Sequence, residues 1–259
     1  MSRINKAFQN KNLLTIFFTA GHPNLNDTEQ IILELDSAGV DIIEIGMPNS
    51  DPLADGPTIQ RSSEKALSNG MNLKLMFQQL KGIRNKTNIP LVLMGYCNQL
   101  LQYGIEDFCK KAAEVGIDGL ILPDLPVEVF ESNCKDVFRK YDLTCSFLVT
   151  PSTSEARIRL LDKASSGFLY AVSSHSITGG TSSGNLSEYG NRLKSMELKN
   201  PIQIGFGIRD NASFSNAVSV ADGAIIGSAF IQKLEEQGEL KHKIQSFVEE
   251  IKNTSSIEA

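Results

Sequence analysis

The feature that most constrains the fold is a repeated alternation of short apolar runs with amphipathic stretches, which continues over almost the whole chain. The apolar runs are rich in Ile, Leu, Val and Phe, and polar residues do not alternate with them. Uninterrupted runs of this kind are typical of parallel strands that are covered on both faces. We therefore predict strands at residues 13–21, 41–46, 90–96, 119–124, 144–149, 167–173, 201–207 and 223–230.

The stretches between these runs have helical spacing. "NDTEQIILELDSAG" begins with an N-cap signal, Asn26 followed by Glu29, and then places apolar residues on one helix face. "EDFCKKAAEVG", "SEARIRLLDKA" and the final "FIQKLEEQGELKHKIQSFVEEI" have the same character. Gly39, Gly116 and Gly167 follow three of these segments, and we expect them to be C-caps or turn residues.

Eight strand-and-helix units in 259 residues predict an α/β fold of the (β/α)₈ TIM-barrel type. A doubly wound sheet is the alternative, but it usually has fewer strands, and no G-x-G-x-x-G follows the first strand here. No linker or break in composition divides the sequence, so we expect a single barrel domain over residues 1–259. A short N-terminal helix is expected at about 1–10 and a frayed tail at about 253–259.

Composition narrows the class of protein further. A hydrophobic fraction of 41% can fill a real core, and a net charge of −5 argues weakly against nucleic acid binding. The N-terminus has no apolar run that could serve as a signal peptide, and no stretch reaches the length of a membrane span. The four cysteines form no C-x-x-C pair and have no His at ligand spacing, which argues against a disulfide scaffold or a zinc site. Buried thiols in a reducing cytoplasm fit best.

Acidic residues occur in and just after the second predicted strand. Glu44 lies inside this apolar run, although carboxylates are almost never fully buried without a partner. Asp51 and Asp55 follow in "SDPLADGP", at the end of the strand where barrels place their catalytic groups. Each residue also has a structural explanation: Glu44 could bond a neighbouring hydroxyl or amide, and both aspartates could form turns. The residues alone leave both explanations open.

Two glycine-rich segments, "GFGIRD" (205–210) and "GSAF" (227–230), end the seventh and eighth predicted strands. Barrels often bind phosphate with the loops at these places and a nearby helix N-terminus. Gly207, Gly227 and Ser228 would offer backbone N–H groups and one hydroxyl. Gly179 and Gly180 of the preceding loop could add to them. The alternative is that these glycines only permit tight turns.

Two kinds of active site have no support in the sequence. No lysine falls inside a predicted strand, which argues against a Schiff-base lysine at the barrel mouth. No cluster of His, Asp and Glu suggests a catalytic metal. Any carbon–carbon chemistry would therefore rely on carboxylates and on the electrons of the substrate itself.

The segment "IEIGMPNSDPLADGPTIQ" resembles the signature of the tryptophan synthase alpha subunit family. The carboxylate signature is specific to this family, whereas the glycine-rich strand ends would fit many phosphate-binding barrels. The resemblance covers nearly the whole chain, because further matches follow in order: "FFTAGHP" (17–23), "MGYCN" (94–98), "LPDLPVEV" (122–129), "GFLYAVS" (167–173), "ITGG" (177–180), "GFGI" (205–208) and "IIGSAF" (225–230).

This resemblance implies a (β/α)₈ barrel that cleaves indole-3-glycerol phosphate to indole and glyceraldehyde 3-phosphate in L-tryptophan biosynthesis. It implies Glu44 and Asp55 as the catalytic pair and Tyr170 as an active-site tyrosine. The substrate-binding residues that it implies are Gly179, Gly207, Gly227 and Ser228 for the phosphate, and Phe17 and Met94 for the indole ring.

The resemblance also implies a partner, a pyridoxal-phosphate-dependent beta subunit in an alpha2beta2 heterotetramer, and no cofactor in this chain. The sequence departs from the family at Asn49, where an aromatic residue is usual, and at Ser174, His175 and Ser176 of the sixth loop. We therefore expect the partner to activate this chain less than is usual for the family. Two alternatives are a catalytically weak chain that mainly activates its partner, and a sugar-phosphate isomerase or epimerase.

Overall fold

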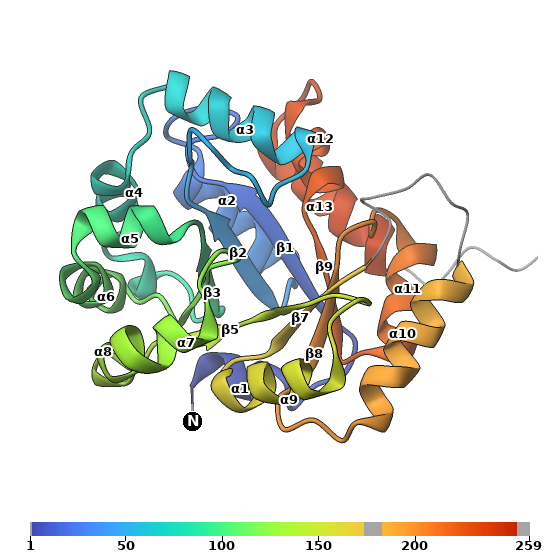
Figure 1. Ribbon diagram of the computed structural model, residues 1–259. Helices are drawn as coiled ribbons and strands as arrows, with labels where there is room; N and C mark the ends of the chain where they lie inside the picture. The colour runs from blue at the N-terminus through green and yellow to red at the C-terminus, as the bar shows by residue number, and fades with distance from the viewer. Residues whose placement is uncertain (1, 174–182, 253–259) are drawn as a thin grey trace, which may run out of the picture.

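The computed structural model describes residues 2–173 and 183–252 of the chain. Parallel strands occupy the centre and helices surround them (Figure 1). The strands of the described residues follow the order β5-β4-β3-β2-β1-β9-β8-β7-β6 in one sheet. Their bounds are β1 Leu13–Thr19, β2 Ile42–Gly46, β3 Leu91–Met94, β4 Gly119–Ile121, β5 Thr144–Ser146, β6 Leu148–Val149, β7 Leu169–Val172, β8 Ile202–Gly205 and β9 Gly223–Ile226.

The two ends of this strand order, β5 and β6, are consecutive in the chain and are separated by one residue, Phe147. The carbonyl of Phe147 accepts a hydrogen bond from Tyr170 N at 2.9 Å, so the interrupted segment still contacts the next strand. The sheet is therefore a nearly closed barrel. The predicted α/β barrel is confirmed, although its fifth strand, 144–149, is divided into two short pieces.

The helices that surround the barrel connect successive strands, and the parallel pairing requires such crossovers. Their bounds are α1 Arg3–Ala7, α2 Thr28–Ser37, α3 Pro57–Ser68, α4 Leu73–Gln79, η1 Ile83–Asn85, α5 Cys97–Tyr103, α6 Ile105–Glu114, α7 Val127–Val129, η2 Phe130–Cys134, α8 Lys135–Lys140, α9 Glu155–Ala164, α10 Ser183–Ser195, α11 Asn211–Val220, α12 Ser228–Glu235 and α13 Leu240–Lys252. The extent of the domain over 1–259 stays a prediction, and the tail predicted at 253–259 lies outside the described residues.

The predicted N-cap of α2 is wrong. Asp27 occupies this position, not Asn26, and its side chain makes no capping hydrogen bond. The Asp27 carboxylate instead accepts a hydrogen bond from the Asn24 amide at 2.8 Å, within the turn that precedes the helix. The side chain of the actual N-cap residue, Asp27, is therefore used by a local turn and not by the helix.

Two of the three glycines expected at helix ends have the predicted role. Gly39 and Gly116 follow α2 and α6 with φ values of 84° and 87°, in the left-handed region that glycine tolerates best. Gly167 has no positive φ, and glycine is required there because a side chain would not fit. A Cβ atom there would lie 2.8 Å from Ser146 Oγ, so glycine permits close contact with β5.

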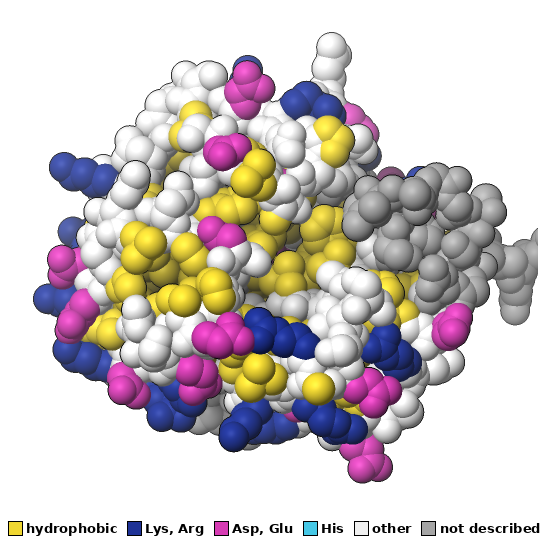
Figure 2. Space-filling model, in the orientation of Figure 1, with side chains coloured by type: hydrophobic (Ala, Val, Ile, Leu, Met, Phe, Trp, Pro, Cys, Tyr) yellow, Lys and Arg dark blue, Asp and Glu magenta, His cyan; other side chains and the backbone are white. Residues whose placement is uncertain are grey.

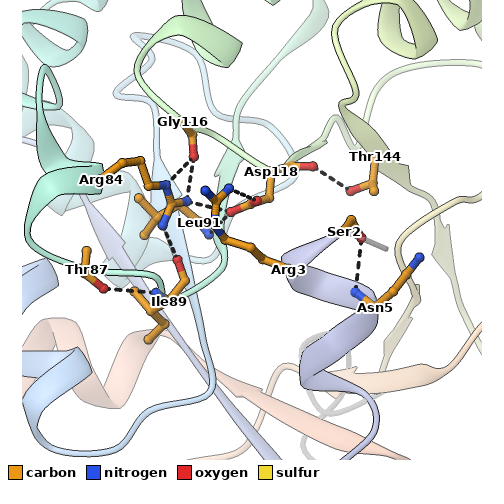
Figure 3. Close-up of polar contacts among 10 residues, drawn as sticks. All are labelled: Ser2, Arg3, Asn5, Arg84, Thr87, Ile89, Leu91, Gly116, Asp118 and Thr144. Atoms are coloured by element: carbon orange, nitrogen blue, oxygen red, sulfur yellow. Dashed lines mark hydrogen bonds and ion pairs between the residues drawn. The ribbon is translucent and has the colours of Figure 1, made fainter.

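An ion-pair group around the buried carboxylate of Asp118 lies at the amino end of the strands (Figure 3). Asp118, which precedes β4, accepts from Arg3 of α1 at 2.9 Å and from Arg84 of η1 at 2.6 Å. The same carboxylate accepts from Leu91 N at the start of β3, also at 2.9 Å. These bonds join α1 to the base of the barrel beside a cavity of about 1590 Å³. In residues 2–173 and 183–252, no helix has the length and apolar character to cross a membrane.

Candidate active site

A second cavity, of about 690 Å³, opens at the carboxyl ends of the strands, where barrels bind their ligands. This volume is in the range of small-molecule sites. The structure brings together every site residue that the family resemblance implies and that the structure describes: Phe17, Glu44, Asp55, Met94, Tyr170, Gly207, Gly227 and Ser228. The remaining one, Gly179, lies outside the described residues, as do Gly180 and the departures at 174–176.

The apolar wall of the cavity follows from the parallel register of the first strands. Phe17 of β1 is the register partner of Glu44 of β2, so an aromatic ring lies beside the carboxyl group. Gly46 makes room for this ring, because a Cβ atom at this position would lie 2.6 Å from the Phe17 ring. Met94, at the end of β3, is buried on the same wall. The cavity can therefore hold a flat apolar group.

Glu44 is 1% exposed, and neither of its carboxylate oxygens has a hydrogen-bond partner among the described residues. Burial, followed by the nearby charge of Asp55, raises the pKa of Glu44 to about 8. The bonded structural role considered for Glu44 is therefore absent from the described residues. The carboxyl group holds a proton at neutral pH and can release it to a neighbour in the cavity.

Asp55 lies in the loop between β2 and α3, two residues before the first residue of the helix. Its Oδ2 accepts a hydrogen bond from the Tyr96 hydroxyl at 2.9 Å, while its Oδ1 is buried without a partner in the described residues. Burial raises the pKa of Asp55 to about 6, and the hydrogen bond from Tyr96 opposes part of this rise. Asp55 is therefore mainly ionised at neutral pH.

The two carboxyl groups thus differ in the way that acid–base chemistry requires. At pH 7 Glu44, with a pKa of about 8, is mostly protonated, and Asp55, with a pKa of about 6, is mostly an anion. Because each charge affects the other, the pair titrates as a unit. One cavity therefore holds a proton donor and a fixed negative charge.

Asp51, the other aspartate of this loop, does not line the cavity. It is exposed, and its backbone N–H donates to Asn49 Oδ1 at 2.9 Å, which closes a tight turn. For Asp51 the structure supports the turn that the sequence offered as an alternative.

Tyr170 of β7 is 4% exposed and faces the carboxyl pair. Burial, then the charges of Glu44 and Asp55, raise its pKa well above the ordinary value, so the phenol stays neutral. Gly205 of β8 provides the space for this side chain, since a Cβ atom there would lie 2.3 Å from the Tyr170 hydroxyl.

The opposite side of the cavity is built from backbone. Phe206 and Gly207 both have left-handed φ values, 68° and 76°, in the turn after β8. Strand β9 ends at Ile226, so the prediction that the strand continues to residue 230 is wrong, and α12 begins at Ser228. Its N-cap residue, Gly227, has no side chain to occupy the first N–H groups of the helix.

The neighbouring helix α11 is different. The Asp210 side chain accepts from Ser213 N at 2.8 Å and caps that helix. The N-terminus of α12 is therefore the better place for an anion, because its N–H groups have no side-chain cap and the helix dipole favours negative charge there.

Sequence reasoning missed several residues of the site. Tyr96, which bonds Asp55, stands in the quoted "MGYCN", two residues beyond the end of β3. A polar residue just past a strand end was an available signal. Ile59, Phe206 and Arg209 also line the cavity, and they stand inside the quoted segments "IEIGMPNSDPLADGPTIQ" and "GFGIRD" without being singled out there. Within residues 2–173 and 183–252, no group of three or more His, Cys, Asp and Glu side chains could hold a metal ion.

Comparison with known proteins gives one consistent result. The family model described as "Tryptophan synthase alpha chain" matches residues 4–258. The tryptophan synthase alpha chain of Christiangramia forsetii is 54% identical over 97% of this chain and 99% of its own length. The protein of the same name from Flavobacterium johnsoniae is 56% identical, over 97% of this chain and 100% of its own.

Solved structures agree. Tryptophan synthase subunit alpha from Legionella pneumophila has a TM-score of 0.88 at 30% identity and covers 97% of each chain. A chain of tryptophan synthase from M. tuberculosis, in an aminoacrylate-bound form, has a TM-score of 0.84 at 31% identity, with 97% of this chain and 98% of that chain covered.

Proposed function

Since the chain belongs to the tryptophan synthase alpha chain family, whose reaction is the cleavage of indole-3-glycerol phosphate, we propose that Glu44 and Asp55 perform this cleavage. The observation that carries the proposal is the carboxyl pair. The two groups share one cavity, and their pKa values are separated to about 8 and about 6. The apolar wall and the uncapped start of α12 fit the two ends of the substrate.

Glu44 acts as the acid and base. Expulsion of indole C3 as a carbanion is too costly, so C3 first takes a proton from Glu44 and the ring becomes an iminium-like indolenine. The bond between C3 and the side-chain carbon then breaks, and its electron pair returns to the ring. The hydroxyl on that carbon gives its proton to Glu44 and becomes the aldehyde of glyceraldehyde 3-phosphate. Such acid–base assistance accelerates reactions by roughly 10²–10⁴.

Asp55 balances the positive charge that develops at the ring nitrogen. Its Oδ1 is buried and has no partner in the described residues, so it is available for the indole N–H. Two opposite unit charges at about 4 Å attract by roughly 4 kcal/mol at an effective dielectric constant near 20, which is an upper value for a partial charge.

The remaining walls bind and orient the substrate. Phe17 and Met94 hold the indole ring, and Tyr170 lies beside the reacting carbons. The phosphate rests on the N–H groups of Gly207, Gly227 and Ser228 and on the Ser228 hydroxyl. Gly179 stays a predicted member of this group.

We further propose that the chain works with a beta subunit in an alpha2beta2 heterotetramer in the cytoplasm, and that pyridoxal phosphate belongs to the partner. The family and the related tryptophan synthase from M. tuberculosis support the partner. Apolar surface is available for docking: Leu53 and Leu101 are 82% and 66% exposed, after β2 and in α5. Hydrophobic side chains also gather on the face in view in Figure 2. The four cysteines are unpaired, as a reducing compartment requires.

The test is turnover of indole-3-glycerol phosphate by the purified chain, with and without the beta subunit, for wild type and for Asp55→Asn. We expect the wild-type chain to cleave the substrate both with and without the beta subunit. Asp55→Asn should lose most of this activity, because an amide cannot balance the charge on the ring nitrogen. Binding of inorganic phosphate should be spared.

Two results would redirect the proposal. Activation of the partner without any cleavage would favour the activator alternative. Full turnover in Asp55→Asn would mean that Asp55 only forms a turn and has no role in catalysis.

A further inference from the structure

The loop that carries Asp55 is held by a segment that does not line the cavity. We call residues 47–56, between β2 and α3, the carboxylate loop. The first turn of α5, which follows β3, lies against this loop, and hydrogen bonds join the two at both ends of the loop. Neither Tyr96 nor Gln99, which make these bonds, lines the cavity itself.

Tyr96 holds the end of the loop at Asp55. Its hydroxyl oxygen accepts a hydrogen bond from Ala54 N at 2.9 Å. The hydroxyl has one proton to donate, and the acceptor at 2.9 Å is Asp55 Oδ2. The direction of both bonds is therefore set by the backbone N–H, and Asp55 is fixed through one oxygen only. This arrangement leaves Oδ1 for the substrate.

Gln99 holds the beginning of the same loop. Its Oε1 accepts from Tyr96 N at 3.0 Å, and its Nε2 donates to the carbonyl of Pro48, also at 3.0 Å. The side chain is 9% exposed, so water competes little for these bonds. Gly95 admits the carboxamide, because a Cβ atom there would lie 2.6 Å from Gln99 Oε1.

We propose that Tyr96 and Gln99 are positioning residues that together hold the carboxylate loop so that Asp55 Oδ1 faces the reacting ring. The inference rests on the proposed role of Asp55. One carboxamide links the backbone of Tyr96 to the start of the loop, and the phenol of Tyr96 links the same helix turn to its end. The loop is thereby held by bonds within this chain.

The first test is Tyr96→Phe, which removes one oxygen atom. We expect kcat to fall about ten- to a hundredfold, the range that a hydrogen bond to a charged group supports, with KM nearly unchanged. The lost bond favours the ionised form of Asp55, so the acidic limb of the kcat/KM profile should move to higher pH. Glu44 and Tyr170 also face Asp55, and they are unchanged in the variant.

The matched control for this variant is Tyr141→Phe. The Tyr141 hydroxyl also donates to a carboxylate, that of Glu106 at 3.2 Å, but this pair is exposed and lies outside the active-site cavity. The control should keep wild-type kcat and an unshifted acidic limb.

The second test is Gln99→Met, which keeps the length of the side chain and removes both hydrogen bonds. We expect kcat to fall about tenfold or more, while the acidic limb stays near its wild-type pH because Tyr96 still bonds Asp55. Gln79→Met is the control, since the Gln79 amide donates at 2.8 Å to the carbonyl of Leu25, in a different loop. It should keep wild-type kcat.

The outcomes separate this inference from the function on which it rests. Wild-type kcat in both Tyr96→Phe and Gln99→Met, with Asp55→Asn inactive, would overturn the inference and leave the proposed function standing. A fully active Asp55→Asn would overturn both. If Gln99→Met does not fold, the kcat and the acidic limb of Tyr96→Phe decide the matter alone.

Discussion

Buried carboxyl oxygens without partners mark the candidate active site at the scale of single residues. Within the described residues these atoms are both oxygens of Glu44 and Oδ1 of Asp55, and all belong to cavity residues. Unpaired buried polar groups are costly, and proteins keep them mainly where function requires them. The cost suggests two predictions, one for activity and one for stability.

The activity should follow a bell-shaped pH profile. The proposed cleavage requires ionised Asp55, so kcat/KM should fall as the pH drops through about 6. It also requires a proton on Glu44, so kcat/KM should fall as the pH rises through about 8. The measurement is kcat/KM for indole-3-glycerol phosphate between pH 5 and about 9.5. A rate that is still rising at the alkaline end would mean that Glu44 enters the reaction ionised.

Glu44→Gln should be inactive and yet more stable than wild type at alkaline pH. The folded-state pKa of Glu44 is about 8, against a model value of 4.5. The folded protein therefore loses stability progressively as pH rises from 4.5 to 8, by on the order of 3 kcal/mol at pH 7. Glutamine keeps the shape and removes this pH-dependent loss.

Thermal unfolding at acidic and alkaline pH provides the check. The advantage of Glu44→Gln in Tm should grow from pH 4.5 to pH 8. Turnover should be below about a hundredth of wild type, in line with a lost acid–base group. Equal pH dependence of Tm in the two proteins would mean that Glu44 is not held protonated.

Glu44 could be predicted from the sequence because it interrupts an apolar strand, and periodicity exposes such an interruption. Without the family resemblance, Asp51 and Asp55 could not be told apart, since both precede turn-forming residues and only the path of the loop separates them. Tyr96 could not be assigned to Asp55 because their contact spans 41 residues and depends on where a phenol reaches.

At the scale of elements, the boundary between β9 and α12 forms the proposed anion site. "GAIIGSAF" is continuously apolar, and this pattern predicts a strand up to Phe230. The structure ends the strand at Ile226 and starts a helix at Ser228. The apolar residues of a buried helix's first turn are too few to show helical periodicity. The sequence pattern therefore cannot show where the strand ends and the helix begins.

Gly227→Val should weaken phosphate binding, whereas Gly227→Ala should not. A Cβ atom at Gly227 would lie 3.4 Å from Phe17, an ordinary contact, but the two methyl groups of valine would extend into the space between Phe17 and Ile59 or into the cavity. The measurement is the KM for indole-3-glycerol phosphate and the Kd of inorganic phosphate, with Gly227→Ala as the control. An unchanged Kd in the valine variant would place the phosphate elsewhere.

At the scale of the whole molecule, the barrel class could be predicted because eight apolar runs separated by helices have few other arrangements. The division of the fifth strand at Phe147 could not, since 144–149 is uniformly apolar or small. The partner subunit could also not be predicted from the hydrophobic pattern or the motifs alone, and only the family resemblance indicates it.

The base of the barrel should control stability without affecting catalysis. Asp118→Asn weakens the contacts with Arg84, which is 16% exposed, and with Arg3, which is 41% exposed. Because water reaches both arginines, the cost should be about 1–3 kcal/mol. Urea unfolding should show a loss of this order, while kcat at 25 °C stays at the wild-type value, because the site lies at the other end of the strands. Asp107→Asn, an exposed residue of α6, should cost less than about 1 kcal/mol. A large fall in kcat for Asp118→Asn would contradict this separation.

The expectation for Asn49 also belongs to the whole assembly. The side chain is 7% exposed, its Oδ1 accepts from Asp51 N, and its Nδ2 lies 3.4 Å from Asn98 Oδ1. Asn49→Phe removes these bonds and restores the aromatic residue usual in the family. We expect slower turnover by the isolated chain but a larger activation by saturating beta subunit. If activation is unchanged or smaller, the polar side chain of Asn49 does not weaken activation by the beta subunit.

The ion-pair group at the base has a consequence for the order of events during synthesis. Arg3 is made almost first, and its carboxylate partner follows 115 residues later, which takes roughly 6–23 s at ribosomal rates. Arg84 is already present by then, so the nascent chain can complete this ion-pair group when only its first three strands have been made. The free edge of β1, however, pairs with Gly223–Ile226. This edge stays open on the ribosome until almost the whole chain has emerged, and unpaired edges invite association with other chains.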